Sequence, residues 1–261
     1  MYRILELNPQ LVPFSDNIDL RMNLYRNTKN RLLTAGQDLK DFANGHNFYG
    51  FHHVEGGWYY REWAPSADQL YLEGEFNNWN PTSHPMKRLD GENWELYLPG
   101  DDTLWHGCKV KTVVDYHGSR TEHLPLYIRR VIQNKSNNTF DAEVVDDRRA
   151  FPWTDQDFVG EDQLYIYEAH VGMAQEKEGV GTYAEFEKKI LPKVRRAGYN
   201  AIQVMAIAEH PYYGSFGYHV SNFFAPSSRF GTPEELKSLI DKAHSMGIAV
   251  IMDIVHAHYV K

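Results

Sequence analysis

Three compact apolar runs in the C-terminal part of the chain restrict its possible folds more than any other feature. They cover residues 164–171, 201–207 and 248–255. Runs this short and this uniformly apolar are typical of strands that are buried on both faces of a sheet. Segments with a helical period separate them, so the expected order is strand, helix, strand, helix, strand. We therefore predict parallel strands joined by right-handed crossovers.

Both helices between these runs have clear start signals. Thr182 and Glu185 form a capping-box pattern ahead of the first apolar stripe. Thr232, Pro233 and Glu235 supply an N-cap, a first-turn proline and a reciprocal glutamate for the second helix.

The third apolar run lies close to the end of the 261-residue chain. Three parallel strands with helices outside them are the first βαβαβ portion of a TIM (β/α)8 barrel, not a closed barrel. We therefore expect the chain to be a piece of a longer barrel protein, truncated after strand 3. The open apolar edge also predicts self-association or poor solubility.

The middle of the chain has a strand period instead. Residues 48–54 and 58–63 flank Glu55-Gly56-Gly57, which is a good hairpin signal because glycine accepts positive φ. Residues 69–74, 94–98 and 109–114 continue the series. Several short strands without a helical period predict an immunoglobulin-like β-sandwich.

The resulting prediction is a multidomain chain with four parts. They are an N-terminal helical segment at 1–45, a β-sandwich at 46–147, a polar linker at 148–163 and the start of the barrel at 164–261. The N-terminal apolar spacing suits short amphipathic helices, broken near Gly36 and Gly45.

Composition excludes several classes of function. A net charge of −8 gives no basic excess to meet phosphates, so nucleic acid is not an expected partner. No apolar stretch of about 18 residues is present, so a membrane is not expected either. Cys108 is the single cysteine, which fits a reducing compartment, and the N-terminus lacks a signal peptide. We expect a cytoplasmic protein.

Polar residues at the end of the third run are the strongest signal of a site. Asp253, His256 and His258 lie where the sites of barrel enzymes lie. If the strand continued, alternation would put Asp253 on one face and both histidines on the other. An Asp and two His at a strand end fit either a sugar site or a metal site. Residues 209–219, after the second run, form an aromatic loop expected at the same end.

Several motifs resemble the eukaryotic type of 1,4-α-glucan (glycogen) branching enzyme, in the α-amylase superfamily. In the C-terminal part they are Tyr167-Glu-Ala-His-Val-Gly-Met173, residues 198–210, Phe216-Gly-Tyr218 with residues 223–229, residues 231–236 and 243–247, and the 253–258 motif. Upstream, residues 61–65, 75–81, 94–99 and 106–111 resemble the starch-binding sandwich of that family.

The resemblance implies roles for particular residues. Tyr218 matches the tyrosine that stacks on the sugar beside the cleaved bond, His258 a histidine that binds a hydroxyl of that sugar, and Asp253 an aspartate of the supporting network. In the sandwich, the residues matched to glucan contacts are Trp79, Lys111, Trp63 and Asn93 in the 90–93 turn.

The resemblance also implies the reaction and what the chain lacks. The partner would be an α-1,4-glucan such as glycogen, starch or a maltooligosaccharide. A retaining transglycosylation would cleave an α-1,4 link and form an α-1,6 link, without a cofactor. The nucleophile and the acid/base are expected beyond residue 261, so the chain alone is expected to be inactive. Ala257 stands where many amylases have a calcium-binding Asn, so no calcium is expected there.

Two other functions stay open on the residues alone. One is a stand-alone glucan-binding protein that uses only the sandwich. The other is a metal-dependent barrel hydrolase with His256 and His258 as ligands.

Overall fold

The computed structural model describes residues 2–134, 137, 139–258 and 260. It contains two compact units, Met1–Phe48 and Tyr49–Lys261. The first unit is helical, and its elements are α1 (Arg3–Leu7), η1 (Pro9–Phe14), α2 (Ser15–Leu32), α3 (Leu39–Phe42) and η2 (Gly45–Asn47). The α2 helix is one element of 18 residues, so the prediction of only short helices here was wrong. The chain leaves α2 at Leu33, ahead of Gly36, whose φ is 89°.

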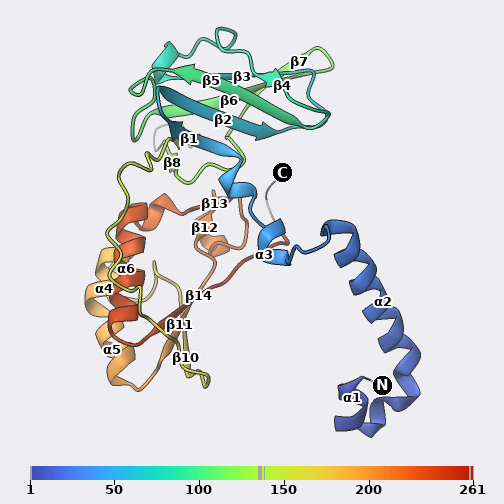
Figure 1. Cartoon of the computed structure of the whole chain (residues 1–261). Helices are drawn as coiled ribbons and strands as arrows, with labels where there is room; N and C mark the ends of the chain where they lie inside the picture. The colour runs from blue at the N-terminus through green and yellow to red at the C-terminus, as the bar shows by residue number, and fades with distance from the viewer. Residues whose placement is uncertain (1, 135–136, 138, 259, 261) are drawn as a thin grey trace. The chain divides into compact units, whose positions relative to one another are not determined.

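The second unit begins with a β-sandwich (Figure 1). Its strands are β1 (Gly50–Val54), β2 (Gly57–Trp63), β3 (Gln69–Gly74), β4 (Lys87–Arg88), β5 (Asn93–Pro99), β6 (Lys109–Tyr116), β7 (Ser119–His123), β8 (Val131–Gln133) and β9 (Phe140–Glu143). One sheet has the order β1-β2-β5-β4 and the other β3-β6-β9-β8, with β7 paired to β6. The predicted sandwich and its first hairpin are confirmed.

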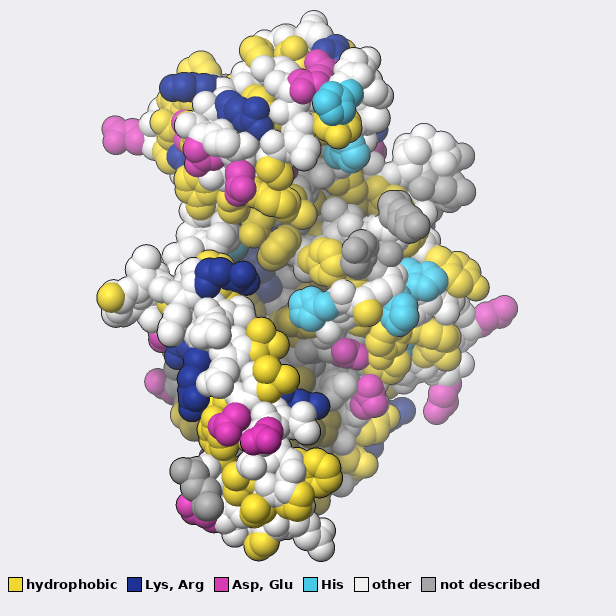
Figure 2. Space-filling view, turned by 90° about the vertical axis from the view of Figure 1, so that its right-hand side faces the viewer, with side chains coloured by type: hydrophobic (Ala, Val, Ile, Leu, Met, Phe, Trp, Pro, Cys, Tyr) yellow, Lys and Arg dark blue, Asp and Glu magenta, His cyan; other side chains and the backbone are white. Residues whose placement is uncertain are grey.

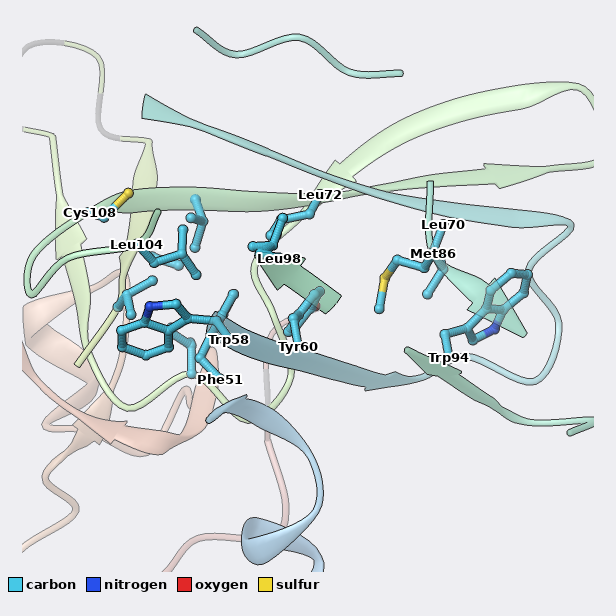
Figure 3. Close-up of a cluster of buried hydrophobic side chains, with 14 of the residues drawn as sticks. Phe51, Trp58, Tyr60, Leu70, Leu72, Met86, Trp94, Leu98, Leu104 and Cys108 are labelled. Carbon is cyan, nitrogen blue, oxygen red and sulfur yellow. The ribbon is translucent and has the colours of Figure 1, made fainter. Parts of the chain in front are cut away.

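Alternation along the strands builds the core of the sandwich. Trp58 and Tyr60 of β2 point inward and are fully buried, whereas Trp63 on the outer side is exposed. Figure 3 shows these rings packed with aliphatic side chains from the facing sheet, including Leu70 and Leu72. Each such side chain stabilises the fold by about 1.5–3 kcal/mol relative to an exposed position.

Cys108 belongs to the same core. Burial raises the pKa of its thiol to about 11, so the side chain is a protonated, unreactive packing group.

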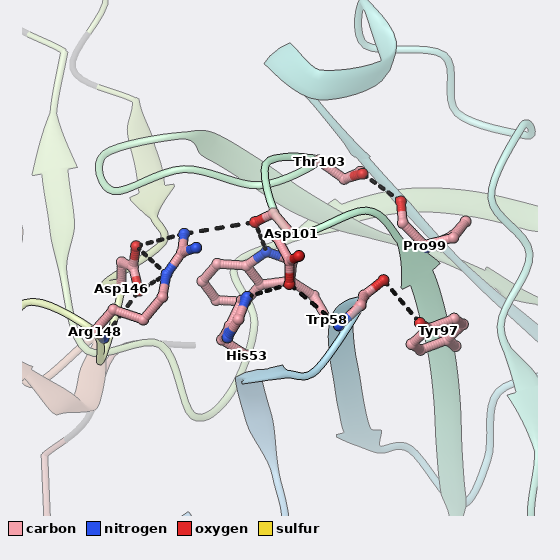
Figure 4. Close-up of polar contacts among 9 residues, drawn as sticks. His53, Trp58, Tyr97, Pro99, Asp101, Thr103, Asp146 and Arg148 are labelled. Carbon is pink, nitrogen blue, oxygen red and sulfur yellow. Dashed lines mark hydrogen bonds and ion pairs between the residues drawn. The ribbon is translucent and has the colours of Figure 1, made fainter.

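A polar network ties the end of the sandwich to its first hairpin (Figure 4). The Asp101 carbonyl accepts the Trp58 indole N–H at 3.0 Å, and its carboxylate lies 2.9 Å from His53 Nε2. Arg148 Nε donates to both carboxylate oxygens of Asp146 at 3.0 Å, and this contact lowers the pKa of Asp146. The Arg148 guanidinium lies 5.8 Å from the centre of the Trp58 ring. These contacts hold residues 146–148, where the chain leaves the sandwich, against Asp101 and Trp58.

The C-terminal part of the second unit is a parallel half-barrel. Its elements are β10 (Ile166–Ala169), α4 (Tyr183–Lys189), α5 (Leu191–Arg196), β11 (Ala201–Val204), β12 (Ala208–Glu209), η4 (Tyr213–Ser215), β13 (Asn222–Pro226), η5 (Ser228–Phe230), α6 (Pro233–Ser245) and β14 (Ala249–Met252). The parallel order is β10-β11-β14, as predicted. The strands are shorter than their apolar runs. β14, for example, ends at Met252, whereas the third apolar run continues to residue 255.

Both predicted helix starts are confirmed. Thr182 with Glu185, and Thr232 with Glu235, form reciprocal capping boxes. The first predicted helix is divided at Ile190 into α4 and α5. Pro192 lies in the first turn of α5, where its missing N–H costs no helical hydrogen bond.

The polar segment predicted as a linker is bound to α6. Thr154 donates through its N–H and its hydroxyl to the Asp241 carboxylate, each at 2.7 Å. Phe158 stacks on His244 with ring centres 4.1 Å apart, and His244 Nδ1 lies 2.5 Å from Asp155. The segment is therefore anchored to the half-barrel, and the exact domain boundaries on either side of it stay predictions.

Within the second unit, the sandwich contacts the β12–β13 region. Tyr127 stacks on Phe224 of β13 with ring centres 4.2 Å apart. Arg229 donates to the side-chain oxygen of Gln133 in β8 at 3.3 Å. None of the described helices combines the length and the apolar character needed to cross a membrane.

Candidate functional site

A hydrogen-bonded tyrosine and aspartate lie at the C-terminal ends of the parallel strands. The Tyr218 hydroxyl donates to Asp253 Oδ2 at 2.9 Å, and this bond raises the pKa of Tyr218. The Asp253 backbone N–H donates to the carbonyl of Val204, the last residue of β11, at 3.2 Å. In a (β/α)8 barrel this end of the strands holds the chemistry.

The loop that presents Tyr218 has a strained backbone. Phe216 has φ 54° and Gly217 has φ 88°, both in the left-handed region. A Cβ at Gly217 would lie 1.6 Å from the Ala206 carbonyl oxygen, so only glycine fits there. The Tyr218 N–H donates to the Ser215 carbonyl at 3.0 Å, which closes the turn. The backbone conformation of the loop thus fixes the position from which the Tyr218 side chain projects.

Glu209 anchors the start of this loop. Its buried carboxylate accepts the Ser227 hydroxyl at 2.9 Å, and the N–H and hydroxyl of Ser228 at 2.8 and 3.0 Å. The Glu209 carbonyl accepts from the N–H of Ser221 at 2.8 Å. Glu209 is therefore a structural anchor, a role that the sequence analysis missed. An acidic residue directly after an apolar run was the available signal.

The two histidines of the 253–258 motif lie outside any strand. The expected alternation between Asp253 and the histidines does not apply, because β14 ends before Asp253. His256 and His258 are both exposed, and His258 has φ 61°. Among the described residues, no hydrogen bond joins His258 to Asp253. The described part of the chain contains no group of three or more His, Cys, Asp or Glu side chains arranged to hold a metal.

Trp79 and Lys111 come together on the second sheet of the sandwich. Trp79 follows β3 with φ 56°, and its N–H donates to the Gly74 carbonyl at 2.8 Å. Lys111 Nζ lies 5.9 Å from the centre of the Trp79 ring and donates to Glu122 at 2.8 Å. An exposed indole face beside a cationic donor combines an apolar platform with a hydrogen-bonding group.

Trp63 and Asn93 form a second group, on the first sheet. The exposed Trp63 donates through its indole N–H to Glu92 at 3.2 Å. The Asn93 amide donates to Asp90 at 2.8 Å and accepts from the Tyr49 hydroxyl at 2.6 Å. Backbone and side-chain hydrogen bonds from Glu92 and Asn93 lower the pKa of Asp90.

This second group borders a pocket that the sequence did not indicate. Trp63 lines an apolar pocket of about 610 Å³ together with Tyr116 and Leu126. The structure therefore divides the four predicted sandwich residues between two places. On the face shown in Figure 2, Lys and Arg side chains are interspersed with Asp and Glu, not gathered into one basic area.

Two family models match separate parts of the chain. Residues 48–128 match carbohydrate-binding module 48, the isoamylase N-terminal domain. Residues 173–261 match the α-amylase catalytic domain.

Full-length relatives decide the family. A 1,4-α-glucan-branching enzyme of Dictyostelium discoideum is 42% identical over 261 residues, which is 98% of this chain. A chloroplastic/amyloplastic 1,4-α-glucan-branching enzyme 2-2 of Arabidopsis thaliana is 41% identical over 262 residues. The chain is a glucan-branching enzyme homologue. This homologue spans 38% of the length of the first relative and 32% of the second.

Solved structures agree on the fold of this branching-enzyme homologue. A pullulanase from Bacillus acidopullulyticus superimposes with a TM-score of 0.67 at 21% identity, over 89% of this chain and 31% of that one. The pullulanase SAP of Group B Streptococcus gives 0.64 at 19% identity, over 79% and 33%. The predicted sandwich and partial barrel are thus confirmed.

Proposed function

We propose that this chain provides the glucan-binding module and one part of the active-site wall of a 1,4-α-glucan branching enzyme of glycogen biosynthesis. The observation that carries the proposal is the 2.9 Å hydrogen bond between Tyr218 and Asp253, at the strand ends of an amylase-type half-barrel. A half-buried tyrosine ring held by a carboxylate is a rigid platform for a sugar face.

Each site residue has a proposed role. Tyr218 stacks on the sugar beside the cleaved bond, Asp253 holds Tyr218 in place, and His258 binds a hydroxyl of the same sugar. The indole of Trp79 and the ammonium of Lys111 bind a glucan chain on the sandwich, and their 5.9 Å separation allows one sugar to meet both. Trp63 and Asn93 form a second contact for the glucan.

The proposed reaction is a retaining transglycosylation. A carboxylate attacks the sugar and forms a covalent glycosyl-enzyme, which the 6-hydroxyl of a glucan then takes in place of water. We place the nucleophile and the acid/base outside these residues, so the purified 261-residue chain should not branch amylose. Measurable branching by the chain alone would contradict this assignment.

Glycogen affinity electrophoresis tests the proposed sugar binding. The intact chain should be retarded in a gel that contains glycogen, and Trp79→Ala should lose most of this retardation. Stacking of a nucleic-acid base on one aromatic ring is worth about 1–3 kcal/mol. We expect a similar size for a sugar face on Trp79, so binding should weaken roughly tenfold or more. Lys111→Ala should weaken binding less, because it removes a hydrogen-bond donor and leaves the platform.

Trp153→Ala is the matched control, because both tryptophan side chains are 38% exposed and Trp153 lies outside the sandwich. Its mobility should equal that of the intact chain. Equal retardation of the Trp79→Ala and Trp153→Ala variants would remove Trp79 from the proposed site. No retardation of the intact chain would reject glucan binding by this module.

A further inference from the structure

His170 is a buried imidazole that the proposed function does not use. It directly follows β10 and is 7% exposed. Neither of its ring nitrogens has a hydrogen-bond partner among the described residues. Three aromatic rings surround it instead. The ring centres of Tyr213, Phe216 and Phe230 lie 5.8, 5.5 and 5.4 Å away, at interplanar angles of 70°, 88° and 89°.

Two of these three rings belong to the loop that carries Tyr218. Tyr213 begins η4, and Phe216 is the left-handed residue two positions before Tyr218. The backbone just after His170 also approaches this loop closely. A Cβ at Gly172 would lie 2.8 Å from the Tyr213 hydroxyl, so a larger side chain does not fit there. The His170 ring is thus a surface against which the loop folds.

The surroundings of His170 favour an uncharged ring. Burial lowers the pKa of His170, and the neighbouring His210 lowers it further. His210 Nδ1 lies 2.9 Å from the Ala208 carbonyl and so carries the proton, while its buried Nε2 has no partner among the described residues. Burial lowers the pKa of His210, and Arg229 contributes in the same direction.

Glu209 and the hydrogen bond to Ala208 raise the pKa of His210, but burial is the larger effect on that ring. The other titratable or charged groups that contact His170 or shift the pKa of His210 are Glu209, Tyr213 and Arg229. The Glu209 carboxylate is occupied by hydrogen bonds from Ser227 and Ser228. An imidazolium at position 170 would therefore have no dedicated counter-ion.

We propose that His170 is a positioning residue for Tyr218, acting as an uncharged ring on which residues 209–218 fold. This inference rests on the proposed role of Tyr218 in the site. Because the protonated ring is disfavoured in the closed loop, acid should open the loop. The folded pKa is depressed, so the loop is fully closed above the ordinary histidine range and loses closure as pH falls below it.

Hydrogen–deuterium exchange of the intact 261-residue chain tests the inference without any sugar. The amides to follow are those of Ser215, Phe216 and Tyr218, which donate to carbonyls within the loop. After correction for intrinsic rates, their exchange should be constant from about pH 8 to pH 6.5 and rise towards about pH 5.

Substitutions at position 170 separate shape from charge. His170→Ala should raise loop exchange at neutral pH by about tenfold or more. His170→Phe should keep the loop protected at neutral pH and remove most of the rise in acid. His219→Gln is the matched control, because His219 is an exposed histidine next to Tyr218 and should keep the wild-type profile.

Three results would overturn the inference. They are an unchanged loop in His170→Ala, the full acid response in His170→Phe, or a charged His170 near neutral pH. The last is measured by ¹⁵N NMR of the imidazole in the unsubstituted chain, so it decides the question even where a variant does not fold. Loss of glucan binding would leave these outcomes intact, which separates this test from that of the proposed function.

Discussion

The sandwich contains a buried carboxyl group, Glu62, at a position where an ionised side chain is energetically unfavourable. Glu62 is 6% exposed at the end of β2 and faces the core. Its carboxylate accepts the Tyr60 hydroxyl at 2.7 Å and the N–H groups of Trp63 and Leu126 at 3.0 and 2.9 Å. Burial nevertheless dominates and raises the pKa of Glu62. These bonds join β2 to the segment that follows β7.

The raised pKa of Glu62 predicts a pH dependence of stability. The folded state holds the Glu62 proton to a higher pH than the unfolded state does, so this group adds stability as pH falls from neutral towards about 4.5. Glu62→Gln cannot titrate and should lack this contribution. Urea unfolding at several pH values should show the free energy of unfolding of the unsubstituted chain rising relative to Glu62→Gln in acid.

Glu95→Gln serves as a comparison for that experiment, because Glu95 lies on the neighbouring strand and is paired with Arg61 at 2.7 Å. Its difference from the unsubstituted chain should not grow in acid. If Glu62→Gln showed the same pH profile as the unsubstituted chain, the buried carboxylate would have no such role.

At the scale of elements, close approach between backbone segments determines the position of the loop that carries Tyr218. The loop after β12 turns at Phe216 and Gly217 and passes directly over the Ala206 carbonyl. Glu209 fixes one end of this loop to η5 through two serines. Its geometry thus depends on backbone shape as much as on side chains.

Gly217→Ala should be strongly destabilising. The substitution forces a Cβ into a left-handed residue and against the Ala206 oxygen, 1.6 Å away, so the loop must move. We expect a loss of more than about 3 kcal/mol in the free energy of unfolding, measured with urea. Gly179→Ala is the control, since Gly179 has φ 95° but open space around it.

The control should cost only the backbone strain of about 1–2 kcal/mol. Equal losses for the two alanine variants would mean that the contact with Ala206 does not determine the loop.

At the scale of the whole molecule, one edge of the parallel sheet is apolar and open. β14 pairs with β11 on one side, and no described strand pairs with its other side. Met252, the last residue of β14, is exposed at this edge, and Ile254 is exposed two residues beyond the end of the strand. Such an edge is a template for pairing with another chain.

Ile254→Lys should reduce self-association of the chain. A charged side chain just beyond an open edge strand opposes extension of that strand and its pairing with another molecule. The average mass from light scattering should rise with concentration for the unsubstituted chain and rise less for this variant. Leu89→Lys places the same charge at an exposed residue of the sandwich, between β4 and β5, and should change nothing. A constant monomer mass for the unsubstituted chain would contradict the prediction.

The sequence by itself determined the elements whose signals are local. The capping boxes at Thr182 and Thr232 depend on residues three positions apart, so they appear in the structure as predicted. Two-residue alternation and a glycine turn likewise determined the β1–β2 hairpin. The order of parallel strands followed from the same periods, and the motifs of the C-terminal part identified the family.

Only the tertiary structure decided which distant side chains meet. Tyr218 bonds Asp253 across 35 positions of sequence, and Tyr127 stacks on Phe224. The end of β14 at Met252 depends on pairing with β11 and not on its own apolar run. Contacts between residues far apart in sequence depend on packing and loop geometry, for which a single sequence carries no local signal.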